Sequence, residues 1–242
     1  MAKFYPARWG RSTHGIHWPS KRARHIMALT FYYGSGSPYA WRVWLALEHK
    51  AIAYVLRPIS FSAGDLVKPE YGKVNPRRKV PAVVDADFPM YESAAIVEYL
   101  EEQYPEGKSL FPGGVRQRAI IRRLVREADE YLAHALEHLV EQVLFTKQDK
   151  WDEQKIFAGC RAFLTELQIF EGYLRHEWFG GDLSAADFTI YPLIALSLRI
   201  AKKKSDLDVQ AGIGPNIAAW MKRMEALPYY EKTYPPHWKA VA

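Results

Sequence analysis

The sequence predicts an α/β domain with the element order βαβαββα, followed by an all-α domain. Three observations lead to this fold class. Between residues 28 and 104, short apolar and aromatic runs alternate with helical patterns. At Tyr104-Pro105-Glu106-Gly107, turn-forming residues interrupt the pattern, and from residue 115 onward only helical periodicity is found. We therefore predict a first domain over residues 28–104, a linker over 105–114 and a helical domain over 115–242.

The first half of the α/β domain reads as strand, helix and strand. Residues 29–33 form a short apolar and aromatic run, which is typical of a strand. A loop rich in Gly and Ser follows at residues 34–38, and its Pro38 suits the first turn of a helix that continues over residues 41–49. Residues 52–58 then predict a second strand.

The second half of the domain adds a helix, a hairpin and another helix. Residues 65–74 carry a weak helical pattern, and residues 81–85 and 88–91 predict two strands joined by the acidic turn Asp85-Ala86-Asp87. Residues 94–103 are helical in pattern. Because the first connections are crossovers and the last is a hairpin, we expect both parallel and antiparallel strand pairs.

The helical domain begins with two long amphipathic segments, over residues 115–146 and 152–178. Apolar residues recur in both at spacings of three and four, as on one face of a helix. They are Ile120, Leu124, Ala128, Leu132, Leu136, Leu139 and Val143 in the first segment, and Ile156, Phe163, Leu167, Phe170 and Leu174 in the second.

A capping box marks the start of the next helix. Ser184-Ala185-Ala186-Asp187 has the box pattern with Asp in place of Glu, and an apolar run continues to residue 198. Pro192 within this run predicts a kink or a displaced boundary. We expect Lys202-Lys203-Lys204 to be an exposed helix end. Residues 215–227 predict one more helix, and the chain from Pro228 a short turn and tail.

The positive charge of the chain is concentrated in its first 27 residues. The formal net charge is +6, from 33 basic and 27 acidic residues, and residues 1–27 hold six of the basic residues and none of the acidic ones. The rest of the chain therefore carries 27 charges of each sign, which argues against a nucleic-acid partner. We expect the leader to be a disordered arm, or the product of a start codon upstream of a natural start at Met27.

Several other classes are excluded by residue content. No stretch approaches the roughly 20 apolar residues of a membrane-spanning helix, so no membrane association is expected. Cys160 is the only cysteine, which excludes an internal disulfide and a Cys-based metal cluster. No grouping of His, Asp and Glu has the spacing of a metal site. The sequence therefore favours a cytoplasmic protein without a bound metal.

Two short motifs predict a site for an extended peptide. Pro81 opens a strand and has no N–H to donate, so the amide and carbonyl of Val80 are left to pair with a ligand backbone. We hypothesise that the Val80-Pro81 bond is cis. Eleven residues on, Glu92-Ser93 stand at the start of a helix, where unpaired N–H groups and the helix dipole favour a carboxylate. Together these features predict a tripeptide site.

The same motifs carry a resemblance to the cytosolic glutathione transferases. Asn75-Pro76-Arg77-Arg78-Lys79-Val80-Pro81-Ala82-Val83 is similar to the family signature NP-x-x-x-VP-x-L, Glu92 to Ile96 is similar to ES-x-AI, and Ser184 to Asp187 matches the capping box of the helical core. The resemblance covers roughly residues 28–236. It implies a thioredoxin-like first domain that binds glutathione, and a serine-type member of the theta or zeta kind or of a bacterial kind.

The resemblance assigns parts of glutathione to residues of the first domain. Val80, before Pro81, would pair with the cysteinyl backbone, Ser93 and its amide would bind the γ-glutamyl carboxylate, and Glu92 would bind the ammonium group. Ser93 can also be an ordinary helix cap. Lys79 and Arg78 would neutralise the glycyl carboxylate, or else form a solvated basic turn.

The resemblance also indicates how a thiol would be activated. Ser37-Pro38-Tyr39-Ala40 stands where thioredoxin-fold redox proteins carry Cys-x-x-Cys, and both cysteines are absent. The nucleophile must then come from glutathione, whose thiolate the protein would stabilise. Ser37 resembles the catalytic serine of theta- and zeta-type members and would donate a hydrogen bond to the thiolate. Ser35 and Tyr39 are competing donors, and Ser37 can instead serve only as a helix cap.

The implied function is conjugation of glutathione to a small hydrophobic electrophile, as in detoxification, by a homodimer. The acceptor pocket would lie between the domains, near Tyr39, His134, His138 and Phe145. Zeta-type isomerases carry Ser-Ser-Cys where this chain has Ser-Pro-Tyr, which makes maleylacetoacetate isomerisation a poorer hypothesis. Two alternatives remain open: a glutathione-dependent isomerase or lyase of one dedicated metabolite, and a non-catalytic protein of the same fold that binds ligands or acts as a scaffold.

Overall fold

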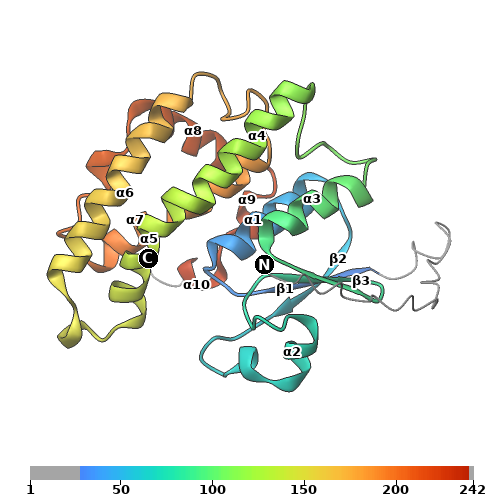
Figure 1. Cartoon of the computed structure of the whole chain (residues 1–242), viewed down its shortest axis with the longest axis horizontal. Helices are drawn as coiled ribbons and strands as arrows, with labels where there is room; N and C mark the ends of the chain where they lie inside the picture. Colours follow the sequence, from blue (N-terminus) through green and yellow to red (C-terminus); the bar gives the residue numbers. More distant parts are fainter. Residues whose placement is uncertain (1–27, 240–242) are drawn as a thin grey trace, which may run out of the picture.

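The computed structural model describes residues 28–239, and Figure 1 shows a mixed sheet with its helices beside a larger helical part. The expected leader lies outside the described residues. The predicted order βαβαββα followed by helices is confirmed. Helix α3 ends at Gln103 and α4 begins at Val115, and the segment between them contains no helix or strand.

Four strands form one mixed sheet in the order β2-β1-β3-β4. Strand β1 (Leu29–Tyr33) pairs in parallel with β2 (Tyr54–Pro58) and antiparallel with β3 (Ala82–Asp85), which pairs antiparallel with β4 (Phe88–Tyr91). Both kinds of pairing were expected from the connections. The register places Tyr32 opposite Ala82 and Ala82 opposite Tyr91, so the loop after β1, the start of β3 and the end of β4 meet at one end of the sheet.

Helices cover both faces of this sheet. Figure 1 shows α1 (Pro38–His49) and α3 (Ser93–Gln103) on one face and α2 (Pro69–Val74) on the other. A 3-10 turn, η2 (Asp65–Val67), precedes α2, so the weak pattern over residues 65–74 corresponds to two short pieces. Phe31 and Val83 on the sheet and Leu45 and Ile96 on the helices are completely buried in the core, so both helices pack on this face of the sheet.

The first helical segment runs from Val115 to Phe145 with two irregular stretches. Helix α4 (Val115–Glu127) continues through the π-helical turn η3 (Ala128–Leu132) into α5 (Ala133–Leu139) and the π-helical turn η4 (Val140–Phe145). The prediction of a helical run over residues 115–146 is thus confirmed, although its π turns have no signature in the three-to-four spacing. Such turns rotate the following side chains relative to an α-helix.

Helix α6 (Glu153–Tyr173) is shorter than predicted: the sequence pattern suggested a helix as far as residue 178, but the helix ends at Tyr173. Before it lies the 3-10 turn η5 (Gln148–Lys150). The chain beyond Tyr173 turns back so that the Phe179 ring packs against Trp220, at 4.9 Å between ring centroids. The chain therefore leaves the helix where Phe179 can be buried, although the spacing of apolar residues would allow the helix to continue.

Helix α7 (Ala185–Lys203) crosses the centre of the helical part, and its capping box is confirmed. Asp187 is fully buried and accepts hydrogen bonds from the Ser184 amide at 2.9 Å, the Phe179 amide at 3.1 Å and the Trp220 indole at 2.8 Å. The helix runs through Pro192 without interruption, so no boundary is displaced there. Lys204 is not part of an exposed end: it is buried, and its Nζ is 2.9 Å from a carboxylate oxygen of Asp206.

The C-terminal segment is more structured than a turn and tail. After the 3-10 turn η6 (Gln210–Gly212) and α8 (Pro215–Glu225) come the short helices α9 (Tyr230–Thr233) and α10 (Pro236–Lys239). The Trp41 indole of α1 donates to Thr233 at 3.1 Å, and its ring makes edge contacts with Tyr234 and Trp238. These contacts hold α10 against the start of α1.

Candidate functional site

Ser37 caps helix α1 in a way that leaves its own proton available. The side-chain oxygen accepts a hydrogen bond from the Ala40 amide at 3.3 Å, and Pro38 occupies the first helical position. No other hydrogen bond of this hydroxyl to a described residue is found, so its O–H can still donate. The positive end of the α1 dipole lies at the same place. The capping role and a donor role are therefore compatible.

Val80 presents an unpaired backbone edge. The Val80-Pro81 peptide is cis, and neither the amide nor the carbonyl of Val80 is hydrogen-bonded to any other residue between 28 and 239. The preceding carbonyl, that of Lys79, accepts from the Tyr71 hydroxyl at 2.6 Å and from the Asn75 side-chain amide at 2.7 Å. Tyr71 and Asn75 thus hold the turn in place and leave the edge beside it open.

Glu92 and Ser93 directly follow β4, the strand that pairs with β3. Since Ala82 pairs with Tyr91, continuing the antiparallel register by two residues brings Val80 toward Ser93. Glu92 is the N-cap of α3 with φ of 69°, a conformation that costs a non-glycine residue about 1–3 kcal/mol and is common at binding sites. Ser93 is the first residue of α3, 7% exposed, and no side chain caps this helix end. The first amides of α3 are thus available to an anion.

The two basic residues before Val80 have different surroundings. The Arg78 guanidinium donates to the Leu66 carbonyl at 3.1 Å and to the Lys68 carbonyl at 3.2 Å. It therefore braces the η2 loop against the turn, and it is not part of the cavity wall described below. Lys79 is exposed and lines that cavity. Of the two candidates for a carboxylate partner, only Lys79 faces the cavity.

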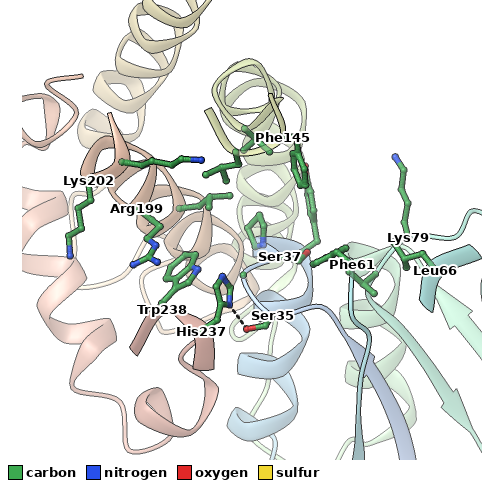
Figure 2. A pocket seen from close by; sticks show the side chains of 18 residues that line it. Ser35, Ser37, Phe61, Leu66, Lys79, Phe145, Arg199, Lys202, His237 and Trp238 are labelled. Carbon is green, nitrogen blue, oxygen red and sulfur yellow. Dashed lines mark hydrogen bonds between the residues drawn. The ribbon is translucent and has the colours of Figure 1, made fainter. Parts of the chain in front are cut away.

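A cavity of about 790 Å³ opens between the two domains. Ser35, Ser37, Tyr39, Lys79 and Val80 contribute to its wall. The other wall residues are Gly36, Pro38, Phe61, Leu66, Val140, Leu144, Phe145, Leu196, Arg199, Lys202, Lys203, His237 and Trp238. Figure 2 shows Ser37 between Lys79 on one side and Arg199 and Lys202 on the other. Pro81 is buried, and neither Pro81 nor Glu92 nor Ser93 is part of the cavity wall.

The residues suggested for the acceptor pocket divide into two groups. Tyr39 and Phe145 line the cavity, whereas His134 and His138 do not. The side chain of His134 is 72% exposed and its Nδ1 lies 3.8 Å from a carboxylate oxygen of Glu137 on the same helix. Both histidines are exposed on α5, so they belong to the surface.

His237 was not found by sequence reasoning. Its Nδ1 lies 2.7 Å from the Ser35 hydroxyl oxygen, the contact drawn as a dashed line in Figure 2. Desolvation, and secondarily the charge of Arg199, lower the pKa of His237, so the ring is neutral near pH 7. Gly36 permits this approach, because a Cβ there would be 2.6 Å from the imidazole and its φ is +83°. Ser35 and His237 are 202 positions apart along the chain, so no local sequence pattern could indicate this contact.

Tyr39 is a poor source of a charged group. Burial chiefly raises its pKa to about 12, with Glu137 and Asp129 adding to the rise and Arg42 opposing it. The Arg42 guanidinium lies 5.7 Å from the centre of the ring. The phenol is therefore protonated at neutral pH, and toward a thiolate it can act only as a neutral hydrogen-bond donor.

Comparison with known proteins assigns this architecture to a family. Residues 31–108 match the model of the glutathione S-transferase N-terminal domain and residues 133–228 that of the C-terminal domain. The chain belongs to the glutathione S-transferase family. The resemblance seen in its motifs is thereby confirmed. As a member, the protein is a glutathione transferase, and glutathione is its co-substrate.

Individual relatives show the same extent of similarity. The transferase is 26% identical to glutathione S-transferase 1 of Manduca sexta over 87% of this chain and 94% of the relative, and 30% identical to mouse maleylacetoacetate isomerase over 81% and 87%. The crystal structure of a glutathione S-transferase from the Antarctic clam Laternula elliptica superposes with a TM-score of 0.74 at 31% identity, covering 89% of this chain and 95% of the other.

Two features are not found among the described residues. Between residues 28 and 239 no three His, Cys, Asp or Glu side chains are grouped so as to hold a metal ion. In the same part of the chain, no helix is both long enough and apolar enough to span a bilayer.

Proposed function

We propose that the transferase binds glutathione at the end of its sheet, with the cysteinyl backbone on Val80 and the thiolate at Ser37. The γ-glutamyl carboxylate then lies at the start of α3, on Ser93 and the first amides, and its ammonium group faces Glu92. Lys79 balances the glycyl carboxylate. The observation that carries the proposal is the meeting of a capped helix start with a free hydroxyl proton, Ser37, and an unpaired strand edge, Val80, in one cavity wall.

Ser37 is favoured over the two competing donors. Its oxygen already accepts from Ala40, which orients the remaining O–H away from the helix. The Ser35 hydroxyl is engaged with His237, and Tyr39 lies inside the first turn of α1 rather than at its N-cap. A donor held at the end of α1 adds to the dipole of that helix, so both favour the thiolate over the thiol.

The reaction we propose is nucleophilic attack by the bound thiolate. The sulfur lone pair forms a bond to an electrophilic carbon of a small apolar acceptor. In a substitution the leaving group departs with its bonding electrons, and in a conjugate addition the resulting carbanion takes a proton from water. Ser37 lowers the pKa of the thiol and so raises the fraction of reactive thiolate at neutral pH.

Two measurements test this function. Glutathione titrated into the protein should release heat in a calorimeter, and the ultraviolet absorbance of the bound thiolate should rise at lower pH than in free glutathione. Turnover of a generic chloronitrobenzene should follow. Binding of a fully protonated thiol without turnover would instead favour a non-catalytic ligand-binding protein, and turnover restricted to a single metabolite would favour a dedicated isomerase or lyase.

We further propose that the protein is a cytoplasmic homodimer that acts in detoxification. The support is its family membership and its resemblance to the cytosolic transferases. Light scattering on the purified protein tests the assembly, since a particle with the mass of one chain would contradict it.

A further inference from the structure

The cavity wall carries charge of one sign only. Its 18 residues include Lys79, Arg199, Lys202 and Lys203, and no Asp or Glu. The described chain as a whole is not so biased, because basic and acidic residues are equal in number once the leader is removed. Field lines focus in a cleft with low-dielectric walls, so such a lining attracts anions.

These cations lie on two separate sides of the cavity. Lys79 stands beside Val80, whereas Arg199, Lys202 and Lys203 come from the last turns of α7, and Figure 2 shows Arg199 and Lys202 across the cavity from Lys79. Glutathione at Val80 and Ser93 uses the Lys79 side. The α7 side is therefore left to whatever occupies the rest of the cavity.

Arg199 and Lys202 are not neutralised by the protein. Neither forms an ion pair with a carboxylate of residues 28–239, in contrast to Lys204 one turn on, which is paired with Glu153 and Asp206. Lys203 donates to the Val143 carbonyl at 2.7 Å. Arg199 is partly buried, with its guanidinium 5.9 Å from the centre of the Trp238 ring. The helix dipole explains a cation at an exposed end, but not a partly buried arginine facing a cavity.

Between the two cationic sides the wall is apolar. Phe61 and Leu66 from the loop before α2, Val140, Leu144 and Phe145 from η4, and Leu196 from α7 supply it. Phe145 is 74% exposed and Phe61 is 47% exposed, so both rings can still gain contact area from a ligand. An apolar body fits the middle of the cavity, and an anionic end fits its α7 side.

We propose that the acceptor of this transferase is an amphipathic anion: an apolar electrophile that carries a carboxylate held by Arg199 and Lys202. The inference rests on the proposed function, because it takes glutathione to occupy the Lys79 side. In the reaction the thiolate bonds to the electrophilic carbon and the leaving group departs with its electron pair. The acceptor carboxylate takes no part in bond changes and serves only to orient the acceptor.

A matched pair of glutathione conjugates tests the proposal without requiring turnover. S-(carboxybenzyl)glutathione and S-benzylglutathione share the tripeptide and the ring and differ by one carboxylate. In a calorimeter at low ionic strength we expect the carboxylate form to bind about tenfold more tightly, which corresponds to about 1.4 kcal/mol. The preference should shrink as salt is added, because the cations are near the surface.

Variants assign the preference to residues. Arg199→Gln and Lys202→Gln should each remove most of it, while the affinity for S-benzylglutathione and for glutathione itself stays within about twofold. Lys222→Gln is the matched control, since it removes the same charge from an exposed position on α8 outside the cavity. Lys202 is exposed, so its replacement leaves folding intact even if Arg199 proves necessary for stability.

The possible outcomes distinguish a failure of the anionic-acceptor inference from a failure of the proposed glutathione transferase function. Equal binding of the two conjugates, with glutathione still bound, would overturn the anionic acceptor alone. A loss of glutathione affinity in the Arg199 or Lys202 variants would overturn it too, because the cations would then belong to the tripeptide site. Failure of glutathione and both conjugates to bind would refute the proposed function and the inference together.

Discussion

Replacing Ser37 by alanine removes a donor and a helix cap at once, and the two effects have different sizes. A hydrogen bond from a hydroxyl to a charged sulfur contributes about 1.5–3 kcal/mol. One pKa unit corresponds to about 1.4 kcal/mol, so Ser37→Ala should raise the pKa of bound glutathione by about one to two units. The dipole of α1 remains, which keeps that pKa below the value of roughly 8.5 for a free thiol.

The structural part of the effect can be separated by a second substitution. Ser37 accepts from the Ala40 amide at 3.3 Å, and loss of such a cap costs about 1 kcal/mol of unfolding free energy with alanine but only a few tenths with glycine. Ser37→Gly therefore removes the donor and retains much of the stability. We expect both variants to shift the thiol pKa equally, while the alanine variant loses more stability in urea than the glycine variant.

The assay is ultraviolet absorbance of the thiolate in the glutathione complex as a function of pH. Calorimetry measures affinity separately, and affinity for glutathione at a pH below both thiol pKa values should be nearly unchanged, because the bond to Ser37 strengthens only with the charge. An unshifted pKa in both variants would refute the reasoning. A larger shift in Ser35→Ala would transfer the donor role to the serine that contacts His237.

Three further outcomes are expected. Ser93→Ala should weaken glutathione binding about tenfold in calorimetry and leave turnover at saturating glutathione intact, because the Ser93 hydroxyl binds a carboxylate that does not react. Unchanged affinity for glutathione would show that Ser93 is not part of the site. Burial raises the pKa of Asp187 to about 6 from 3.8, so its contribution to the unfolding free energy is present at acid pH and lost as pH rises through about 6. In urea titrations Asp187→Asn should flatten this fall, and parallel pH profiles for the two proteins would contradict the linkage. Cys160 is buried and desolvation raises its thiol pKa, so an aromatic disulfide reagent should label it only upon unfolding; rapid labelling of the native protein would show that the site opens.

Much of the fold could be predicted because its signals are local. Pro38 and Ser37 mark the start of α1 within two residues of each other, and the Ser184 capping box spans four. Alternating and helical spacing then distinguish strands from helices over five to ten residues. The motif around Val80 and Pro81 is similarly short, so the sequence is sufficient to predict the candidate glutathione site.

Errors arose where distant contacts compete with local preference. The pattern after Tyr173 continues in helical spacing, but Phe179 gains more from burial against Trp220 than from another helical turn. His134 was expected near the acceptor pocket, yet its side chain is 72% exposed and its Nδ1 lies 3.8 Å from Glu137 on the same helix. Arg78 reads as a carboxylate partner, yet two loop carbonyls bind its guanidinium.

The sequence by itself determined the order of elements, the free edge at Val80, the helix starts at Ser37 and Ser93 and the lack of a reactive cysteine pair, because each depends on a backbone group or side chain and its near neighbours. The tertiary structure alone decided that His237 meets Ser35, that Arg199 and Lys202 face the same cavity as Lys79, and that Phe145 stays exposed beside them. The physical reason is the distance along the chain over which each interaction acts. Caps and missing N–H groups act over a few residues, whereas the walls of a cavity are set by packing between helices that are far apart in the chain.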